Sequence, residues 1–205
     1  MSRRTRWIVG GIGWALVAAM GAVMAWQARE QSAREAAPPV LMPIEAFTLL
    51  DQDGHELRSE ERLRGKVWIA GFAFTSCTSI CPMLTSQMAN VQRRLEAHGD
   101  RVHLVTITVD PETDTPERMR EYAERYGADL SSWSFLTGEP ARVRATIEQG
   151  FRRPIGARVE TPGGYDILHS GDLMLVDQDG MLRGLYPTDQ EGLDRLVADV
   201  DRLVR

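Results

Sequence analysis

Cysteine is scarce in this chain, which has only two cysteines, Cys77 and Cys81, among 205 residues. So few cysteines exclude a scaffold held together by several disulfides. An excess of basic charge is also missing. The formal net charge is -5, and the first 39 residues contribute +3 from five arginines and two glutamates, so the remainder carries about -8 (-5 minus +3). Nucleic-acid binding depends on clustered lysine and arginine, so this balance excludes that class of partner.

The rest of the composition is ordinary for a globular protein, with 43% hydrophobic and 26% charged residues. The sequence has neither an internal repeat nor a low-complexity segment. The length suits one domain with an appendage.

The appendage is an uncharged run from Trp7 to Gln27, which follows three arginines. About 20 residues are enough to cross a hydrocarbon core of roughly 30 Å as a helix. Positive flanking charge holds the N-terminus in the cytoplasm. A cleavable signal peptide usually has a shorter apolar core and a small-x-small site, and here Trp26 and Gln27 interrupt the candidate site.

We therefore predict an uncleaved signal anchor over residues 1–27, formed by one transmembrane helix, and a linker over residues 28–42. Residues 43–205 would then form a domain in the periplasm or another extracytoplasmic space, attached to the inner membrane by a single span. A cleaved signal peptide would place the domain in the same compartment.

Apolar periodicity predicts strands and helices in alternation along this domain. Strands are expected over residues 44–50, 66–74, 102–109, 172–176 and 181–186, and helices over 82–98, 115–126, 141–150 and 189–204. Residues 152–165 contain several prolines and glycines and are expected to be irregular. This order predicts an α/β domain with a central mixed sheet flanked by helices, as in thioredoxin-like folds.

Both cysteines lie between the strong strand at 66–74 and the helix that begins at Pro82. The positive end of the helix dipole favours thiolate over thiol there. Residues four apart on one helical turn are roughly 5–6 Å from each other. The two sulfurs could therefore form a structural disulfide, exchange disulfides with a partner, or bind a soft metal ion.

A third ligand would favour the metal, and the chain has four histidines. His55, His98 and His103 lie beside a turn, at a helix end and at a strand start, where we expect no functional role. His169 lies between the irregular segment and a strand, but the residues alone do not place it near the thiols.

Four stretches in collinear order resemble the Sco/SenC family. Residues 74–82, Phe-Thr-Ser-Cys-Thr-Ser-Ile-Cys-Pro, are similar to its FT-x-C-x-x-x-C-P signature. Residues 108–116 resemble its VDP-x-x-DTP run, residues 133–138 its W-x-x-LTG run, and the segment from His169 to Gly180 its histidine loop and hairpin. The likeness covers about residues 44–204. It implies a membrane-anchored copper-binding protein of thioredoxin-like fold that helps to assemble cytochrome c oxidase.

The resemblance implies that Cys77, Cys81 and His169 bind one copper ion, Cu(I) or Cu(II). It implies a copper chaperone that delivers this ion to the copper-bearing subunit of the oxidase, with a periplasmic copper donor as a possible upstream partner. Two positions depart from the family pattern: Thr78 stands where the family often has Pro, and Leu168 where it often has Asp before the histidine.

Three other functions compete with delivery of copper. The main alternative is a thiol-disulfide oxidoreductase that keeps the cysteines of the oxidase copper site reduced. A peroxidase and a copper or redox sensor are further alternatives. Among the remaining residues of the matching stretches, Asp110 and Asp114 are expected to build a turn and Trp133 to pack. Met88 and Met174 are expected to fill apolar core faces, and thioether ligation by them or by Met83 is not favoured.

Overall fold

The structure is a computed structural model that describes residues 20–27, 36–161 and 164–204. The chain divides into two compact units, Met1–Ala37 and Pro38–Arg205. In the first unit residues 20–27 are helical, and most of the predicted anchor and linker lies outside the described residues. Within the described ranges, the structure has no helix with both the length and the apolar character needed to cross a membrane.

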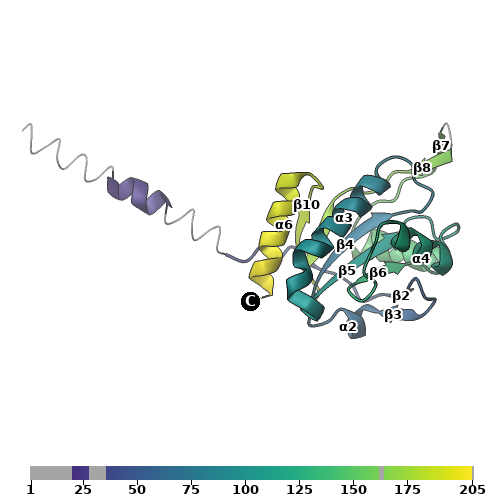
Figure 1. Cartoon of the computed structure of the whole chain (residues 1–205), viewed down its shortest axis with the longest axis horizontal. Coiled ribbons are helices and arrows are strands. Elements are labelled where there is room, and N and C mark those ends of the chain that lie inside the picture. Colours follow the sequence, from purple (N-terminus) through teal and green to yellow (C-terminus); the bar gives the residue numbers. More distant parts are fainter. Residues whose placement is uncertain (1–19, 28–35, 162–163, 205) are drawn as a thin grey trace, which may run out of the picture. The chain divides into compact units, whose positions relative to one another are not determined.

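The second unit is built around a six-stranded sheet with the strand order β1-β10-β9-β4-β5-β6 (Figure 1). Its strands are β1 (Met42–Pro43), β4 (Val67–Ala73), β5 (Val102–Thr108), β6 (Trp133–Leu136), β9 (Leu173–Val176) and β10 (Met181–Tyr186). Strands β4, β5 and β6 are parallel to one another, whereas β9, β10 and β1 are joined by antiparallel pairing. The sheet is therefore mixed, as predicted.

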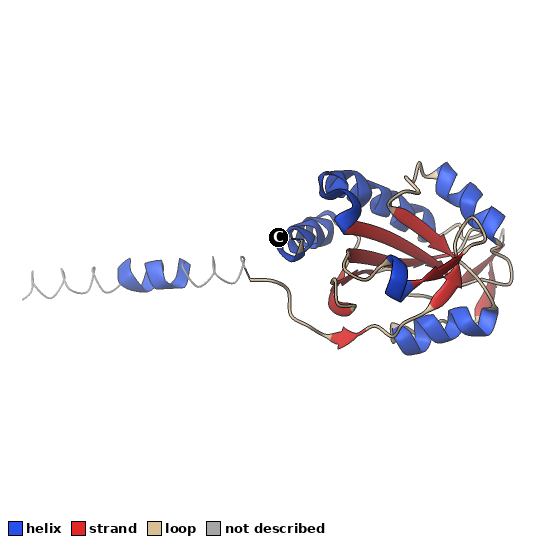
Figure 2. Cartoon of the chain, turned by 90° about the horizontal axis from the view of Figure 1, so that it is seen from below, coloured by secondary structure: helices blue, strands red, loops and turns tan. Residues whose placement is uncertain are grey.

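The sheet is covered on both faces, which explains why its central strands are almost wholly apolar. Every residue of β4 and β5 is buried. One face packs against the three long helices, α3 (Cys81–Leu95), α4 (Pro116–Arg125) and α6 (Gln190–Leu203). Figure 2 shows helices on both sides of the strands.

The opposite face carries the smaller elements, α5 (Pro140–Ala145), η2 (Thr146–Gly150), α2 (Ser59–Arg62) and a hairpin of β2 (Thr48–Leu50) and β3 (Glu56–Arg58). Phe151 lies at the centre of this layer, because its ring packs edge-on against Trp68 and Phe72 of β4, with centroids 5.9 and 5.5 Å away. Such aromatic pairs stabilise a core beyond the area they bury. The three layers form a thioredoxin-like α/β fold.

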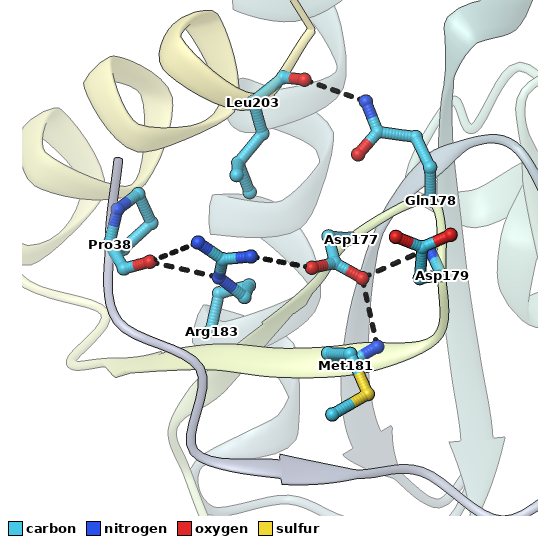
Figure 3. Close-up of polar contacts among 7 residues, drawn as sticks. All are labelled: Pro38, Asp177, Gln178, Asp179, Met181, Arg183 and Leu203. Atoms are coloured by element: carbon cyan, nitrogen blue, oxygen red, sulfur yellow. Dashed lines mark hydrogen bonds and ion pairs between the residues drawn. The ribbon is translucent and has the colours of Figure 1, made fainter. Parts of the chain in front are cut away.

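The beginning of the second unit is tied to the β9–β10 turn by Arg183 (Figure 3). Its guanidinium donates to the carbonyl of Pro38 and pairs with Asp177, with 2.7 Å between Nη1 and Oδ2. Asp177 in turn accepts from the backbone N–H groups of Asp179 and Met181. Residues 38–42, assigned to the linker by the sequence prediction, thus lie against the domain, and β1 begins at Met42.

Several elements differ from the sequence prediction. Of the strand expected over residues 44–50, only 48–50 are a strand, β2, while β1 precedes the expected range at 42–43 and belongs to a different sheet. Strand β6 was not predicted, and neither was the hairpin of β7 (Arg158–Thr161) and β8 (Gly164–Ile167), in the stretch expected to be irregular. Glycines and prolines dominate the local signal in that stretch, whereas the hairpin depends on pairing between the exposed β7 and the partly buried β8.

The helical elements agree more closely with the prediction. The helix expected over residues 82–98 ends at Leu95 and continues as the 3-10 segment η1 (Glu96–Arg101). Thr115 caps α4 as predicted, since its side chain accepts from the N–H of Arg118. The predicted helix at 141–150 is α5 followed by a single π-helical turn, η2.

Candidate metal centre

The two cysteines lie in and just after the loop that joins β4 to α3, as the sequence predicted. Both are free and buried. Cys81 is the first residue of α3, and Cys77 lies in the preceding non-helical loop, so the two residues do not share one helical turn. This corrects the geometric argument from their spacing: the loop conformation, and not helix periodicity, sets where Cys77 lies relative to Cys81.

A buried carboxylate braces the start of this loop. Asp114 is fully buried, and its carboxylate accepts from the N–H and the hydroxyl of Thr75, at 3.1 and 2.5 Å. The hydroxyl of Thr108, at the end of β5, donates to the same carboxylate at 2.5 Å. Burial raises the pKa of Asp114, although the hydrogen bonds from both threonines oppose this shift. Asp114 therefore joins the cysteine loop to the neighbouring strand, and Thr115, not Asp114, caps α4.

The structure brings His169 to Cys81. Its imidazole Nε2 lies 3.4 Å from the sulfur of Cys81, a residue 88 positions away in sequence. The topology explains this contact. Strand β9 runs antiparallel to β4, so the beginning of β9 lies beside the end of β4, from which the cysteine loop starts. The sequence alone had left this placement open.

The hydrogen bonds of His169 determine which ring nitrogen faces the thiols as an acceptor. Its Nδ1 lies 2.9 Å from the carbonyl oxygen of Ser170. Because a carbonyl only accepts, Nδ1 carries the proton, and the lone pair of Nε2 points toward Cys81. Burial lowers the pKa of His169, which favours the neutral ring. A neutral imidazole with a free Nε2 lone pair is the form that binds metal ions.

The two thiols have unequal acidities. Burial opposes the charged form of Cys77, but hydrogen bonds from Cys81 and Ser79 outweigh it and lower the pKa of the Cys77 thiol. Burial and the neighbouring Cys77 both raise the pKa of Cys81 well above the ordinary thiol range. Cys77 is therefore the more reactive thiol. Cys81 keeps its proton until a base removes it or a metal cation displaces it.

Three apolar residues close in sequence to Cys81 and His169 are exposed. Ile80, Met83 and Leu168 are exposed, by 40%, 47% and 80% of their surfaces. The side chain of Leu168 thus points into solvent, while its backbone carbonyl accepts from the N–H of Gly156 at 2.8 Å. The imidazole is oriented by Ser170, so the family aspartate that Leu168 replaces is not needed to hold the ring in this structure.

The other candidates have structural roles. His103 is buried and lies 2.9 Å from the hydroxyl of Ser134, and burial, with nearby Arg62 and Lys66, lowers its pKa to about 3. The expected packing roles of Trp133, Met88 and Met174 are confirmed, because all three side chains are fully buried.

His98 and His55 also lie apart from the thiols. His98 pairs with Asp201 at 2.7 Å on the helical face. His55 lies near Asp51 and Asp53, with side-chain ligand atoms within 4.8 Å of one another. However, Asp51 accepts from two backbone N–H groups and Asp53 pairs with Arg120, so turn formation accounts for this cluster.

Two residues near the site were missed by the sequence analysis. Asp166 accepts from Ser79 at 2.9 Å, and the Ser79 oxygen lies 3.4 Å from the Cys77 sulfur. Tyr165 bonds to Asp110 and stacks on Phe74. Both belong to β8, which the sequence analysis treated as irregular, so no predicted element placed them beside the cysteine loop.

Cys81 Sγ and His169 Nε2 are in contact, but the ligand atoms of Cys77, Cys81 and His169 do not all lie within 4.8 Å of one another; among the described residues only Asp51, Asp53 and His55 do. Thiolate sulfur and imidazole nitrogen are donors that suit copper. The same two thiols can also be oxidised to a disulfide. The geometry supports both kinds of chemistry and excludes neither.

Comparison with known proteins identifies the family. The SCO1/SenC family model matches residues 39–205. The chain is 34% identical over 164 residues to the SCO1 protein homolog of Bacillus subtilis strain 168. The aligned residues make up 79% of this chain and 83% of that protein.

Solved structures agree with this match. Bradyrhizobium japonicum ScoI with copper bound superposes with a TM-score of 0.68 and 28% identity, over 78% of this chain and 99% of that one. BsSco is described as a member of the Sco family of cytochrome c oxidase assembly proteins with a disulfide switch. It superposes with a TM-score of 0.69 and 31% identity, over 83% of this chain and 98% of that one. The chain therefore belongs to the SCO1/SenC family.

Proposed function

We propose that this protein is a copper chaperone, which binds one copper ion through Cys77, Cys81 and His169 and delivers it to the copper-bearing subunit of a cytochrome c oxidase. The contact between His169 Nε2 and Cys81 Sγ, at 3.4 Å, is the observation that carries this proposal. It supplies the third soft donor that a bare pair of thiols lacks.

The chemistry of these donors suits copper. Thiolates favour Cu(I), and imidazole accepts either oxidation state of copper. Three protein ligands leave a coordination position on the ion free for a partner, and exposed apolar residues lie near the ligands in sequence: Ile80, Met83 and Leu168. An ion held in this way can pass to a partner by stepwise exchange of ligands, which a closed four-ligand site would hinder.

The family members support both the cargo and its destination. Copper is bound in the ScoI structure, and BsSco is described as an oxidase assembly protein. We further propose that residues 1–27 anchor the domain to the inner membrane, with residues 38–205 on the periplasmic side, where an upstream copper donor would load it. Such an anchor would hold the domain close to a membrane-bound oxidase.

A second function is favoured by one observation, the unequal pKa values of the two thiols. A low-pKa thiol beside a high-pKa partner is the arrangement with which dithiol oxidoreductases attack a disulfide and then resolve it. Reduction of a disulfide on the recipient subunit would convert Cys77 and Cys81 to a disulfide. It would therefore be carried out by a chain without copper, because copper binding requires that both thiols are reduced.

Copper transfer tests the proposal directly. The reduced full-length chain, loaded with one equivalent of Cu(I) under anaerobic conditions, is mixed with the apo form of the soluble copper-binding domain of the oxidase subunit. We expect copper to move to the recipient from the wild-type chain and from His55→Ala, which matches His169→Ala in chemistry but lies outside the site.

We expect Cys77→Ala, Cys81→Ala and His169→Ala to bind copper more weakly. A His169→Ala variant that still reduced an oxidised recipient at the wild-type rate, combined with a wild-type chain that retained no copper, would replace the chaperone with the oxidoreductase.

A further inference from the structure

His169 reaches the thiols from a loop with little regular structure of its own. The described residues between β8 and β9, 168–172, form neither helix nor strand. The preceding β7–β8 hairpin pairs only with itself and not with the six-stranded sheet. Every residue of β7 is exposed. Besides the backbone bond from Gly156 to Leu168 and the pairing of β9 with β4, the side-chain contacts of β8 join this loop to the rest of the domain.

Tyr165 supplies the most extensive of these contacts. Its hydroxyl donates to the carboxylate of Asp110, just beyond the end of β5, and lies 3.4 Å from the hydroxyl of Thr113. Its ring stacks on Phe74 with centroids 5.6 Å apart and planes inclined by 20°. The guanidinium carbon of Arg158 lies 3.4 Å from the centre of the same ring. The Tyr165 side chain thus connects β7 and β8 to the loops that follow β4 and β5.

Phe74 connects this contact to the metal centre. The Phe74 ring is buried at the start of the cysteine loop, and it also packs edge-on against the imidazole of His169, with centroids 6.2 Å apart. Tyr165 and His169 therefore lie against the same aromatic ring, three residues before Cys77. A shift of Tyr165 relative to Asp110 would move the imidazole relative to the thiols.

We propose that Tyr165 is a positioning residue for copper binding, which holds the histidine loop against the cysteine loop through its hydrogen bond to Asp110 and its stacking on Phe74. This inference deepens the proposed function and rests on it for the copper measurement. Tyr165 does not touch the ion. It holds the imidazole near its bound position before copper arrives, so less ordering accompanies binding.

The first test compares tyrosine-to-phenylalanine variants of the full chain. Tyr165→Phe keeps the stacked ring and removes the bond to Asp110. Tyr186→Phe is the matched control, because Tyr186 also donates to an aspartate, Asp199, at 2.7 Å, but on the packing face of α6. We expect Tyr165→Phe to bind Cu(I) about tenfold more weakly in competition with a chromophoric chelator, the loss typical of one charge-assisted hydrogen bond.

A double-mutant comparison with Asp110→Ala separates positioning from a direct effect of the carboxylate on the ion. If Asp110 acts through Tyr165, each single variant and the double variant should show about the same loss of Cu(I) affinity. Losses that multiply in the double variant would mean that Asp110 and Tyr165 act independently and would overturn the inference.

Hydrogen exchange on the metal-free chain tests, without copper, whether Tyr165 holds the histidine loop in place. We expect amides in residues 164–172 to exchange faster in Tyr165→Phe than in the wild type or in Tyr186→Phe, and by a larger factor than the amides of β4 and β5. Equal exchange in all three chains would overturn the positioning role. If the wild-type chain binds no copper, the proposed function fails, and the exchange result still decides whether Tyr165 holds the loop.

Discussion

Among single residues, Cys77 and Cys81 show how burial and hydrogen bonding give two identical side chains different acidities. Cys77 lies in the loop beside Ser79, and its thiolate is stabilised there, whereas Cys81 lies fully buried at the start of α3. The helix dipole alone would favour thiolate at both positions. Burial outweighs it at Cys81, which is 0% exposed.

This difference predicts unequal alkylation of the reduced, metal-free chain. The thiolate is the reactive form, so Cys77 should react with iodoacetamide at least about tenfold faster than Cys81 near neutral pH. The rate at Cys77 should rise with pH and reach half of its maximum below the ordinary thiol pKa of 9.0, because the folded-state pKa is lowered. Peptide mass spectrometry after timed quenching measures both rates, and faster labelling of Cys81 would contradict this assignment.

Leu168 offers a second test at a single residue. Leu168 stands where the family often has an aspartate, a carboxylate that could act on Cu(II) affinity, on imidazole orientation or on partner docking. In the structure the side chain is 80% exposed and Ser170 orients the imidazole.

Leu168→Asp should therefore keep the thermal stability and change Cu(I) affinity by no more than about threefold, since a solvent-exposed charge contributes little. Chelator competition measures the affinity, with Leu185→Asp as an exposed control away from the thiols. A change of tenfold or more in Leu168→Asp alone would show that residue 168 acts on the ion.

Among elements, the loop from β4 to α3 depends on a partner that local sequence signals do not reveal. The sequence analysis expected Asp114 to build a turn near the cap of α4. That turn is present, because the N–H of Asp114 donates to the carbonyl of Asp110 at 2.9 Å. In addition, the Asp114 carboxylate accepts from Thr75 and Thr108 and joins the end of β4 to the end of β5.

Asp114→Ala should therefore lower the free energy of unfolding by about 2–3 kcal/mol, because it leaves buried donors without an acceptor. Urea unfolding of the metal-free chain measures this loss. Asp201→Ala removes an exposed aspartate and serves as the control. A loss below about 0.5 kcal/mol, the usual range of surface substitutions, would show that the hydrogen bonds of the Asp114 carboxylate contribute little to stability.

The contrast between elements also explains which of them the sequence could predict. Strands β4 and β5 and helices α3, α4 and α6 have strong apolar periodicity, and all five were expected close to their observed bounds. The β7–β8 hairpin has one fully exposed strand, β7, and a four-residue partner, β8, too short for a clear periodic signal, so its aromatic contact with Phe74 is visible only in the folded chain. Tyr165 and Asp166 were missed for that reason.

At the scale of the whole molecule, sheet topology assembles the site. The antiparallel pairing of β9 with β4 brings a histidine from the C-terminal third of the chain to the cysteine loop. Composition and spacing in the sequence gave His169 no such position, and only the family resemblance singled it out. The thioredoxin-like arrangement and the two cysteines at a strand-to-helix junction followed from local patterns alone.

The N-terminal edge of the domain provides the whole-molecule prediction. Arg183 and Asp177 form a largely buried ion pair that also binds the carbonyl of Pro38 (Figure 3). Arg183→Ala leaves Asp177 buried without its cation, so the free energy of unfolding should fall by about 3 kcal/mol. Cu(I) affinity should stay unchanged, because Asp177 lies at the end of β9 opposite to the one that follows His169.

Urea unfolding and chelator competition on the same preparation measure the two effects of Arg183→Ala. Arg58→Ala, which removes an exposed arginine paired with Glu56 and Glu61, is the control. Equal stability of the two variants would contradict the role assigned to the Arg183 contacts.

X-ray absorption of the reduced chain loaded with one equivalent of Cu(I) tests the central claim most directly. The account predicts two sulfur neighbours and one imidazole nitrogen around copper in the wild type, and loss of the nitrogen with both sulfurs kept in His169→Ala. A wild-type spectrum without sulfur neighbours, or an imidazole signal that persists in His169→Ala, would contradict a site formed by Cys77, Cys81 and His169.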